Sequence, residues 1–308
     1  VNNNNLSKAI KYLKKNDLIG VPTETVYGLA GNAYSKKTIE KIYKLKNRPS
    51  INPLIVHYFS IKNLIKDAEL NKNFYKIYNK LCPGPITFVL KRKKYSKINN
   101  LVTANLNTIA VRFPSNIVVR KILKRINFPL AIPSANKSSG ISPVTSKDVA
   151  EEFGNRLKLI IDDGNCKVGI ESTVVDLTGK TKILRPGVIS AVQISKIIKS
   201  KVSILKNSKN IKSPGSLKKH YSPGIPMKLN QIKSYNEHAF IIFGKKFKDT
   251  KNTFNLSKKS NLKEAAKNLY KIFRVIKNKN YKKIYVAKIP NRGIGIAIND
   301  RLKHASEI

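Results

Sequence analysis

Residues 46–57 have the sequence Lys46-Asn47-Arg48-Pro49-Ser50-Ile51-Asn52-Pro53-Leu54-Ile55-Val56-His57. This stretch predicts a loop that runs into a short apolar strand. Pro49 and Pro53 restrict the backbone and remove two N–H donors that a helix needs, so we expect a stiff, extended segment. Residues 54–56 have the composition of a buried strand. Lys46 is a cation, and Arg48 offers a planar fork of donors that suits phosphate or carboxylate oxygens. The stretch therefore predicts an anion-handling loop at the edge of a sheet.

Helical and strand patterns follow one another on both sides of this loop. Apolar residues recur at helical spacing in residues 6–16, 37–45, 60–80, 116–126, 148–153 and 194–198. Short apolar runs, several of them ended by proline, predict strands within residues 82–90, 108–114, 130–136, 159–164, 169–176 and 183–187. This irregular order favours an α/β domain with a twisted mixed sheet and flanking helices over a clean doubly wound one.

Hydroxyl groups alternate along residues 23–27, just before two glycines. Thr23, Thr25 and Tyr27 would share one face if this segment were a strand. Gly28 and Gly31 permit a close approach of the backbone or a positive φ. The segment is thus a second place where polar groups are expected at the edge of the sheet.

The composition changes after residue 200. Residues 201–228 are rich in Pro, Gly and Ser and predict a linker. Residues 229–308 then carry a β-α-β-α pattern, which predicts a small Rossmann-like C-terminal α/β domain. Gly293-x-Gly295 is too short a signal for a nucleotide site, and we interpret it as a turn before a helix. The expected organisation is a catalytic domain over residues 1–200, the linker, and this second domain.

The charge is strongly positive, with 61 Lys and Arg against 17 Asp and Glu and a net charge of +44. Such a surface indicates either a polyanionic partner, RNA or anionic lipid, or a compositional bias toward Lys, Asn and Ile. The lysines are spread along the whole chain, which favours the bias, and even then such a surface should attract nucleic acid weakly and in a salt-dependent way. An RNA-binding module would instead bind tRNA tightly with a steep salt dependence.

Location and redox state follow from the apolar runs and the cysteines. No run of about 18 apolar residues is present, and the first residues are polar, so we expect a cytoplasmic protein with no membrane partner. Cys82 and Cys166 fit no metal or redox spacing and are expected to be reduced structural thiols.

A set of small polar and cationic residues lies near predicted loops and strand ends. The cations are Lys46, Arg48, Arg112 and Arg185; the hydroxyls are Thr25, Thr108, Ser134, Ser142 and Ser172; Asn52, Asn136 and His57 complete the set. The chain has no nucleophile elbow, no metal-ligand cluster and no phosphate-binding GxxxxGK[ST] loop. The set is suited to holding a phosphorylated, carboxylate-bearing substrate, and not to covalent attack.

Taken together, these residues resemble the threonylcarbamoyl-adenylate synthase family, which is also described as YrdC-like. The matching segments are Pro22–Leu29, Lys46–His57, Pro83–Thr87, Val111–Pro114, Pro133–Asn136, Asp163-Gly164, Glu171–Asp176 and Leu184–Gly187. Ser213-Pro214-Gly215, His220–Pro223 and the ending Gly293 to Leu302 are similar to the longer, two-domain form of the family. The resemblance covers nearly the whole chain.

The resemblance implies a nucleotidyltransferase that converts L-threonine, bicarbonate and ATP to threonylcarbamoyl-AMP and pyrophosphate, with Mg²⁺ as cofactor. The product would pass to a tRNA-modifying transferase complex that modifies the adenosine next to the anticodon. Threonine would be held by Thr25, His57, Arg112, Ile132 and Ser172. ATP would be held by Arg48, Asn52, Thr108, Ser134, Ser142, Arg185 and Tyr221, and the catalytic residues would be Lys46 and Arg48.

The resemblance leaves the general base open, with His57 as a candidate, and no protein-bound metal is implied. Tyr221 and the linker would fold over the active site and exclude water from a labile intermediate. Two alternatives remain at this level: a non-catalytic RNA-binding module, suggested by the charge, and a carbamoyl transferase of hydrogenase maturation, which shares the YrdC-like domain. The sequence lacks the aromatic motif of an RRM and the zinc-finger cysteines of such a transferase.

Overall fold

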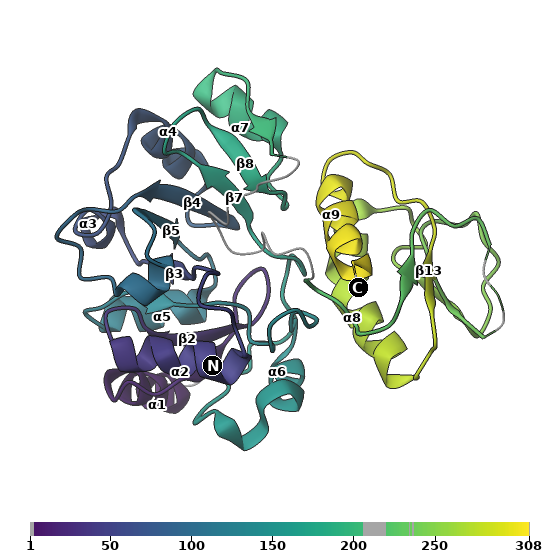
Figure 1. Ribbon diagram of the computed structural model, residues 1–308, viewed down its shortest axis with the longest axis horizontal. Coiled ribbons are helices and arrows are strands. Elements are labelled where there is room, and N and C mark those ends of the chain that lie inside the picture. The colour runs from purple at the N-terminus through teal and green to yellow at the C-terminus, as the bar shows by residue number, and fades with distance from the viewer. Residues whose placement is uncertain (1–2, 206–219, 234, 236, 308) are drawn as a thin grey trace.

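The computed structural model describes residues 3–205, 220–233, 235 and 237–307, and these form two units that lie side by side (Figure 1). The first unit contains a nine-stranded mixed sheet in the order β1-β2-β6-β3-β5-β4-β7-β8-β9. Its strands are β1 Ile19–Val21, β2 Gly28–Asn32, β3 Ile55–His57, β4 Ile86–Lys91, β5 Thr108–Arg112, β6 Leu130–Ala131, β7 Thr173–Asp176, β8 Lys182–Arg185 and β9 Ser203–Ile204. The expected mixed α/β sheet is confirmed.

Helices cover both faces of this sheet (Figure 1). They are α1 Asn3–Lys14, α2 Lys36–Lys46, α3 Ile61–Leu64, α4 Lys72–Leu81, α5 Ile117–Arg125, α6 Ser146–Phe153 and α7 Ala191–Ile198, with short 3₁₀ turns at Asn100–Thr103 and Gly154–Arg156. Ser35 caps α2 at its start, and Asn47 ends it in the left-handed region, so the following loop leaves the helix at a fixed angle.

Two apolar clusters hold the helices to the sheet. Ile39 and Ile42 of α2 and Phe74 of α4 are fully buried in the larger cluster. Leu13 of α1 and Ile122 of α5 are buried in a second cluster, together with strands β1, β2 and β6. Because each of these helices places one apolar stripe inward, the sheet is fixed from both sides and its strand ends can carry polar side chains.

The second unit is built on a four-stranded sheet in the order β10-β13-β11-β12, in which all pairs are parallel. Its elements are β10 Met227–Lys228, β11 Ala239–Ile242, β12 Thr253–Asn255, α8 Leu262–Asn278, β13 Ile284–Val286 and α9 Gly295–Ser306. Helices α8 and α9 lie between this sheet and the first unit (Figure 1). A parallel sheet with crossover helices agrees with the predicted Rossmann-like fold.

Several details differ from the sequence-based expectations. Residues 159–164 form no strand but a single bridge, between Gly20 and Ile160. The strand expected over residues 130–136 ends at Ala131. Residues 22–27 are a loop, because the Thr23 hydroxyl accepts hydrogen bonds from the N–H groups of Thr25 and Val26 and turns the chain.

The loop after α2 is also not extended as predicted. The N–H of Asn52 donates to the Pro49 carbonyl at 3.0 Å, so these residues form a turn. Pro49 sets its φ, and the turn returns the chain to the start of β3.

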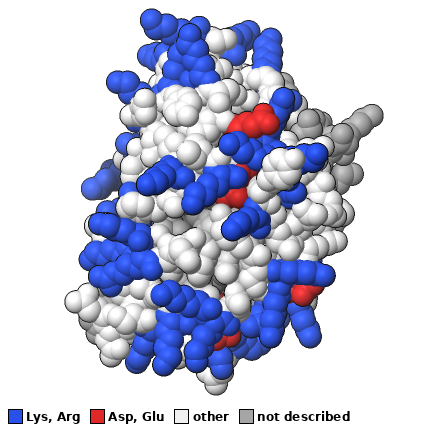
Figure 2. Space-filling model, turned by 90° about the vertical axis from the view of Figure 1, so that its left-hand side faces the viewer, with Lys and Arg blue, Asp and Glu red and all other residues white. Residues whose placement is uncertain are grey.

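Both sheets reach into the segment predicted to be a linker. Ser203–Ile204 pairs with β8, and Met227–Lys228 pairs with β13. The Ser213-Pro214-Gly215 motif lies outside the described residues. Lys and Arg side chains are spread over the face of the first unit that is turned away from the second, with few carboxylates among them (Figure 2). Within the described ranges, no helix has the length and apolarity that crossing a membrane requires.

Candidate functional site

Polar side chains cross the first sheet in a row at the end of its central strands. His57 on β3 and Thr87 on β4 both pair with Arg112 on β5. Residues directly opposite one another on neighbouring strands have their side chains on the same face. The Thr87 hydroxyl lies 2.8 Å from that of Ser172, which accepts from Arg185 Nη2 at 3.2 Å. Five neighbouring segments thus contribute to one polar row.

A small cavity of about 50 Å³ lies over this row. Seven residues predicted for the site line it: Thr25, Arg48, Arg112, Ile132, Ser134, Ser172 and Arg185. Glu171 and His220 line it as well, and neither was predicted as a site residue. Three arginines therefore face one enclosed space, which is suited to a multiply charged anion.

Arg112 is held by two residues of the 22–27 loop. Its Nη2 lies 2.7 Å from Glu24 Oε1, and its Nη1 donates to Thr25 Oγ1 at 3.0 Å. Burial would raise the pKa of Glu24, but the nearby guanidinium outweighs this and lowers it. The carboxylate is thus ionised and paired with Arg112 near neutral pH.

His57 is a buried, neutral imidazole. Burial first, and the charge of Arg112 second, hold the pKa of His57 well below its usual range. Its Nδ1 lies 3.3 Å from the Ile55 carbonyl, and its Nε2 has no hydrogen-bond partner among the described residues. A buried nitrogen without a partner is costly, so His57 is suited to receive a polar ligand group.

Arg48 is fixed by its own loop. It donates to the Asn52 side-chain oxygen at 2.7 Å and to the Asn52 and Pro53 carbonyls at 3.0 and 2.8 Å. Burial lowers the pKa of Arg48 to about 10, which leaves it charged at neutral pH. The turn that starts at Pro49 thus places a preorganised cation in the cavity.

Lys46 is the last residue of α2 and is only 1% exposed. Its ammonium group donates to the Ser134 carbonyl at 2.6 Å and also to the Asn136 carbonyl. Burial and the neighbouring Arg48 hold the pKa of Lys46 well below its usual range. Lys46 therefore fixes the 134–136 segment.

Glu171 is a carboxylate at which the two units meet. It accepts from Ser142 Oγ at 2.6 Å in the first unit, and from Tyr270 at 2.9 Å and Arg301 Nε at 2.8 Å in the second. Burial would raise the pKa of Glu171, but the charges of Arg301 and Arg185 hold it at about 2. The cavity wall is thus completed by the second unit.

His220 and Tyr221, at the end of the predicted linker, are packed into this junction. Their ring centroids are 4.0 Å apart, and the Arg301 guanidinium lies 5.1 Å from the centre of the Tyr221 ring. Burial lowers the pKa of His220 to about 3, and burial with Glu171 raises that of Tyr221 to about 12. His220 lines the cavity, so the described end of the linker closes it.

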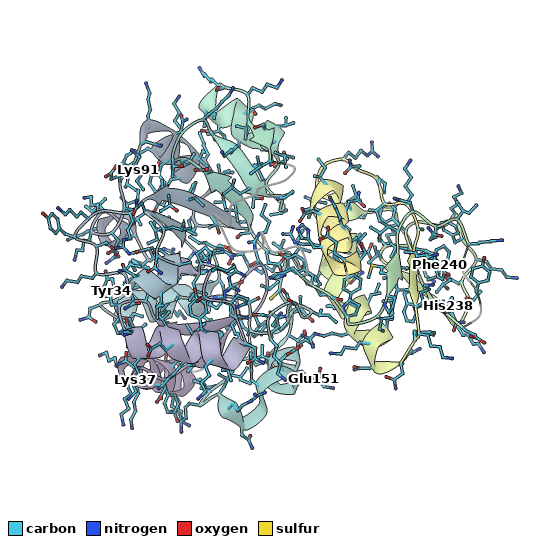
Figure 3. The ribbon with its side chains drawn as sticks, in the orientation of Figure 1. Tyr34, Lys37, Lys91, Glu151, His238 and Phe240 are labelled. Atoms are coloured by element: carbon cyan, nitrogen blue, oxygen red, sulfur yellow. The ribbon has the colours of Figure 1, made fainter. Side chains whose placement is uncertain are left out.

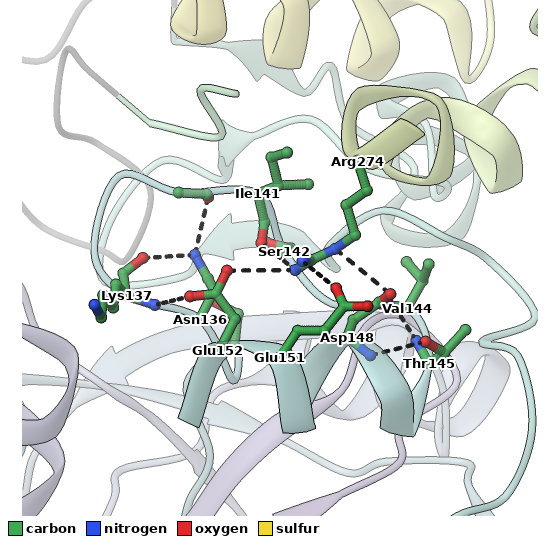
Figure 4. A network of polar contacts seen from close by, with 12 residues as sticks. Asn136, Lys137, Ile141, Ser142, Val144, Thr145, Asp148, Glu151, Glu152 and Arg274 are labelled. Carbon is green, nitrogen blue, oxygen red and sulfur yellow. Dashed lines mark hydrogen bonds and ion pairs between the residues drawn. The ribbon is translucent and has the colours of Figure 1, made fainter. Parts of the chain in front are cut away.

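A second contact between the units lies beside the cavity wall. Arg274 of α8 reaches three carboxylates of α6, Asp148, Glu151 and Glu152, at 3.6 to 3.8 Å (Figure 4). It also donates to the Ile141 carbonyl at 3.0 Å. Glu151 lies on the side of the first unit that faces the second (Figure 3). The 137–145 segment, which carries Ser142, is thus held by the second unit.

The remaining predicted residues lie around the cavity instead of lining it. Asn52, His57, Ser142, Lys46 and Tyr221 are buried next to its walls. Thr108 stands four residues before Arg112 on β5, about 13 Å away along the strand. The buried atoms that lack hydrogen bonds in the described chain include His57 Nε2, Asn52 Nδ2, Arg112 Nε, His220 Nδ1 and the Tyr221 hydroxyl. Such a gathering is typical of a ligand site.

Sequence reasoning missed Glu24, Thr87, Glu171, His220 and Arg301 as parts of this site. Glu24 and Glu171 stand inside the motifs that carry the family resemblance, so their position was a usable signal. Arg301 is 130 residues from Glu171, and no local pattern announces that contact. Among the described residues, no group of three His, Cys, Asp or Glu side chains is arranged to hold a metal ion.

Comparisons with known proteins agree with this geometry. A family model described as telomere recombination matches residues 11–187, and one described as threonylcarbamoyl-AMP synthase, C-terminal domain, matches residues 189–307. The threonylcarbamoyl-AMP synthase of Pyrococcus abyssi is 31% identical, with 97% of this chain and 93% of that protein covered. The Bacillus subtilis enzyme is 30% identical, with 99% and 94% covered.

A solved structure matches over the same extent. The crystal structure of P. abyssi Sua5 complexed with L-threonine has a TM-score of 0.89 and 29% identity, covering 98% of this chain and 94% of that one. Both units and their junction are therefore shared. The chain belongs to the threonylcarbamoyl-AMP synthase family.

Proposed function

We propose that this protein converts L-threonine, bicarbonate and ATP to threonylcarbamoyl-AMP and pyrophosphate. The observation that carries the proposal is the cavity lined by Arg48, Arg112 and Arg185, next to which the His57 Nε2 is buried without a hydrogen bond among the described residues. A carboxylate and a polyphosphate need several fixed cations, and an amino acid needs polar partners beside them.

The residues divide into two groups in this proposal. Threonine is held by Thr25, His57, Arg112, Ile132 and Ser172, and its carboxylate pairs with Arg112. ATP is held by Arg48, Asn52, Thr108, Ser134, Ser142, Arg185 and Tyr221. Lys46 and Arg48 are the residues on which catalysis depends, Arg48 by contact with phosphate and Lys46 through the 134–136 segment.

Catalysis in this proposal is mainly electrostatic. The threonine amine and bicarbonate would first form a carbamate with loss of water. A carbamate oxygen would then attack the α-phosphorus of ATP as pyrophosphate leaves, and fixed cations would stabilise the charge that develops on the phosphorus oxygens. Mg²⁺ enters bound to the phosphates, which is its usual mode where a protein offers few ligands. His57 is the candidate acceptor for the proton that the threonine amine must lose, because its Nε2 has no hydrogen bond among the described residues, although its lowered pKa makes it a weak base.

The proposal also covers the organisation of the chain. Residues 1–200 form the catalytic domain, residues 201–228 the linker over the active site, and residues 229–308 the C-terminal domain. The cavity of about 50 Å³ is smaller than two waters at about 30 Å³ each, so ATP requires that His220 and Tyr221 move out. Their return would exclude water from the carbamoyl-adenylate.

The protein's surroundings are part of the same proposal. It works in the cytoplasm and hands its product to a tRNA-modifying transferase complex, with no membrane partner. Family membership favours this enzyme over a purely RNA-binding module, and the match of the C-terminal model to residues 189–307 favours it over a hydrogenase-maturation transferase. Weak tRNA binding stays a prediction from the net charge of +44.

Pyrophosphate release tests the proposal. We expect release that depends on threonine, bicarbonate, ATP and Mg²⁺, and its loss in Arg48→Ala and Arg112→Ala. The variant Arg125→Ala, at the exposed end of α5, serves as a matched control. If the purified protein releases no pyrophosphate with all four components present, the proposal is wrong.

A further inference from the structure

Glu24 belongs to the motif 22–29, yet the proposed reaction gives it no role. Its carboxylate is 6% exposed and pairs with Arg112, whose side chain is 5% exposed. Arg112 lines the cavity of about 50 Å³. Glu24 instead lines a different cavity of about 360 Å³, together with Tyr27, Asn116 and Cys166. The pair therefore stands between the two cavities, and Glu24 is outside the one assigned to substrate.

The contacts of Arg112 show what Glu24 does for it. Glu24 forms an ion pair with Nη2 at 2.7 Å, and the Thr25 hydroxyl accepts a hydrogen bond from Nη1 at 3.0 Å. Adjacent residues of one loop thus contact both ends of the guanidinium. Nε and Nη2 are both buried without a hydrogen bond in the described chain, so the contact of Nη2 with Glu24 is an ion pair. The orientation of the fork is thus set before any substrate arrives.

The loop that supplies these contacts is itself fixed. The Thr23 hydroxyl lies 2.9 Å from the Thr25 hydroxyl and donates to the Val26 carbonyl at 2.5 Å. It also accepts from the N–H groups of Thr25 and Val26, each at 3.2 Å. A guanidinium tied to a rigid turn loses little entropy when it binds a carboxylate, which is the physical basis of preorganisation.

We propose that Glu24 is a positioning residue, which orients Arg112 for the carboxylate of threonine without touching the substrate itself. The inference rests on the proposed function in one respect, the assignment of Arg112 to that carboxylate. A plain counter-ion for a buried arginine would stabilise the fold but would not favour one substrate over the other.

Three substitutions of Glu24 separate reach from charge. Glu24→Gln keeps the length and an oxygen acceptor but loses the charge, whereas Glu24→Asp keeps the charge and loses one methylene of reach. Glu24→Ala loses both. Positioning predicts that Glu24→Asp and Glu24→Ala weaken threonine binding at least about tenfold, and that Glu24→Gln weakens it less than about threefold. A charge effect predicts the reverse order for the Asp and Gln variants.

The readout is the dissociation constant of threonine, and separately of ATP, by isothermal titration calorimetry on the full chain. ATP affinity is expected to stay within about threefold of wild type in all three variants. Asp176→Asn is the matched control, since Asp176 is 2% exposed and ion-paired with Lys182 on the neighbouring strand β8, remote from Arg112. It is expected to lower stability without changing threonine affinity.

Specific results would overturn the inference. The first is a threonine affinity within about twofold of wild type in Glu24→Asp. The second is a lower threonine affinity in Glu24→Gln than in Glu24→Asp. The third is an equal loss of affinity for threonine and for ATP. Unchanged threonine binding in Arg112→Ala would overturn it too. If Glu24→Ala does not fold, the Asp and Gln variants still decide. Wild-type protein that binds threonine but forms no product would contradict the proposed function and leave this inference standing.

Discussion

At the scale of single residues, Lys46 shows how a buried cation can act through the backbone of a neighbouring segment. Its ammonium group donates hydrogen bonds to the carbonyls of Ser134 and Asn136, and the side chain is buried. A buried ammonium is retained only where its donors are satisfied. The 134–136 segment is therefore held to the end of α2 by one side chain.

Replacing Lys46 with Met removes these donors and keeps the apolar stem. We expect the KM for ATP to rise about tenfold or more, the worth of one lost hydrogen bond to a charged group, with the KM for threonine within about threefold. Steady-state pyrophosphate release measures both. Lys44→Met, an exposed residue on the same helix, is the control. Equal changes in the two KM values would contradict this role.

His220 makes stability depend on pH. The unfolded chain takes up a proton on this residue below about pH 6.5, whereas the folded protein does so only near its pKa of about 3. The free energy of unfolding should therefore fall by about 1.4 kcal/mol per pH unit as the pH drops through this window. His220→Gln should lack this part of the slope. Urea unfolding at pH 7, 6, 5 and 4 measures it, and equal slopes in both proteins would refute the burial of a neutral His220.

At the scale of elements, α6 and α8 are joined by Arg274 and its three carboxylates (Figure 4). Arg274→Met leaves these like charges together without a cation. We expect the free energy of unfolding to fall by about 2 kcal/mol, and by less in 1 M NaCl, where such pairs are screened. Lys277→Met, exposed on the same helix, should change it by less than about 0.5 kcal/mol. A loss that does not respond to salt would argue against an electrostatic contact.

The elements that could be predicted from the sequence are those with a strong local pattern. Helix α2 and strand β5 agree with the expected ranges 37–45 and 108–114 because their apolar spacing is regular and Pro114 ends the strand. Residues 159–164 have a strand-like composition but form only one bridge, through Ile160. Composition alone does not show whether a neighbouring strand is available for pairing. Alternation at Thr23 and Thr25 suggested a strand, whereas hydroxyl-to-backbone bonds made a turn.

The residues of the site also divide into those that the sequence predicted and those that only the structure shows. Arg48, Arg112 and Arg185 were predicted and line one cavity, because Arg112 and Arg185 end strands β5 and β8 and the turn after α2 brings Arg48 beside them. The contact between Glu171 and Arg301 joins residues that local spacing cannot relate. Family resemblance supplied the proposed substrate residues, while the contacts of Glu24 and Glu171 with their neighbours became visible only in three dimensions.

At the scale of the whole molecule, one apolar cluster includes Ile170 of the first unit, Tyr221 of the linker and Tyr270 of the second unit. Arg301→Met would leave the Glu171 carboxylate buried without its cation. We expect a loss of about 3–5 kcal/mol in a single cooperative transition of both units, and partial recovery in the double variant with Glu171→Gln. Arg292→Met, exposed before α9, is the control. Two separate calorimetric transitions in the wild-type protein would show that the units do not fold together.

The central claim is that the site around Arg48, Arg112 and Arg185 makes a threonine-derived adenylate. Mass spectrometry of a mixture of protein, L-threonine, bicarbonate, ATP and Mg²⁺ tests it most directly. We expect threonylcarbamoyl-AMP with the wild-type protein, none when bicarbonate or threonine is left out, and none with Arg112→Ala. Absence of this compound with folded wild-type protein, or its undiminished formation by Arg112→Ala, would contradict the claim.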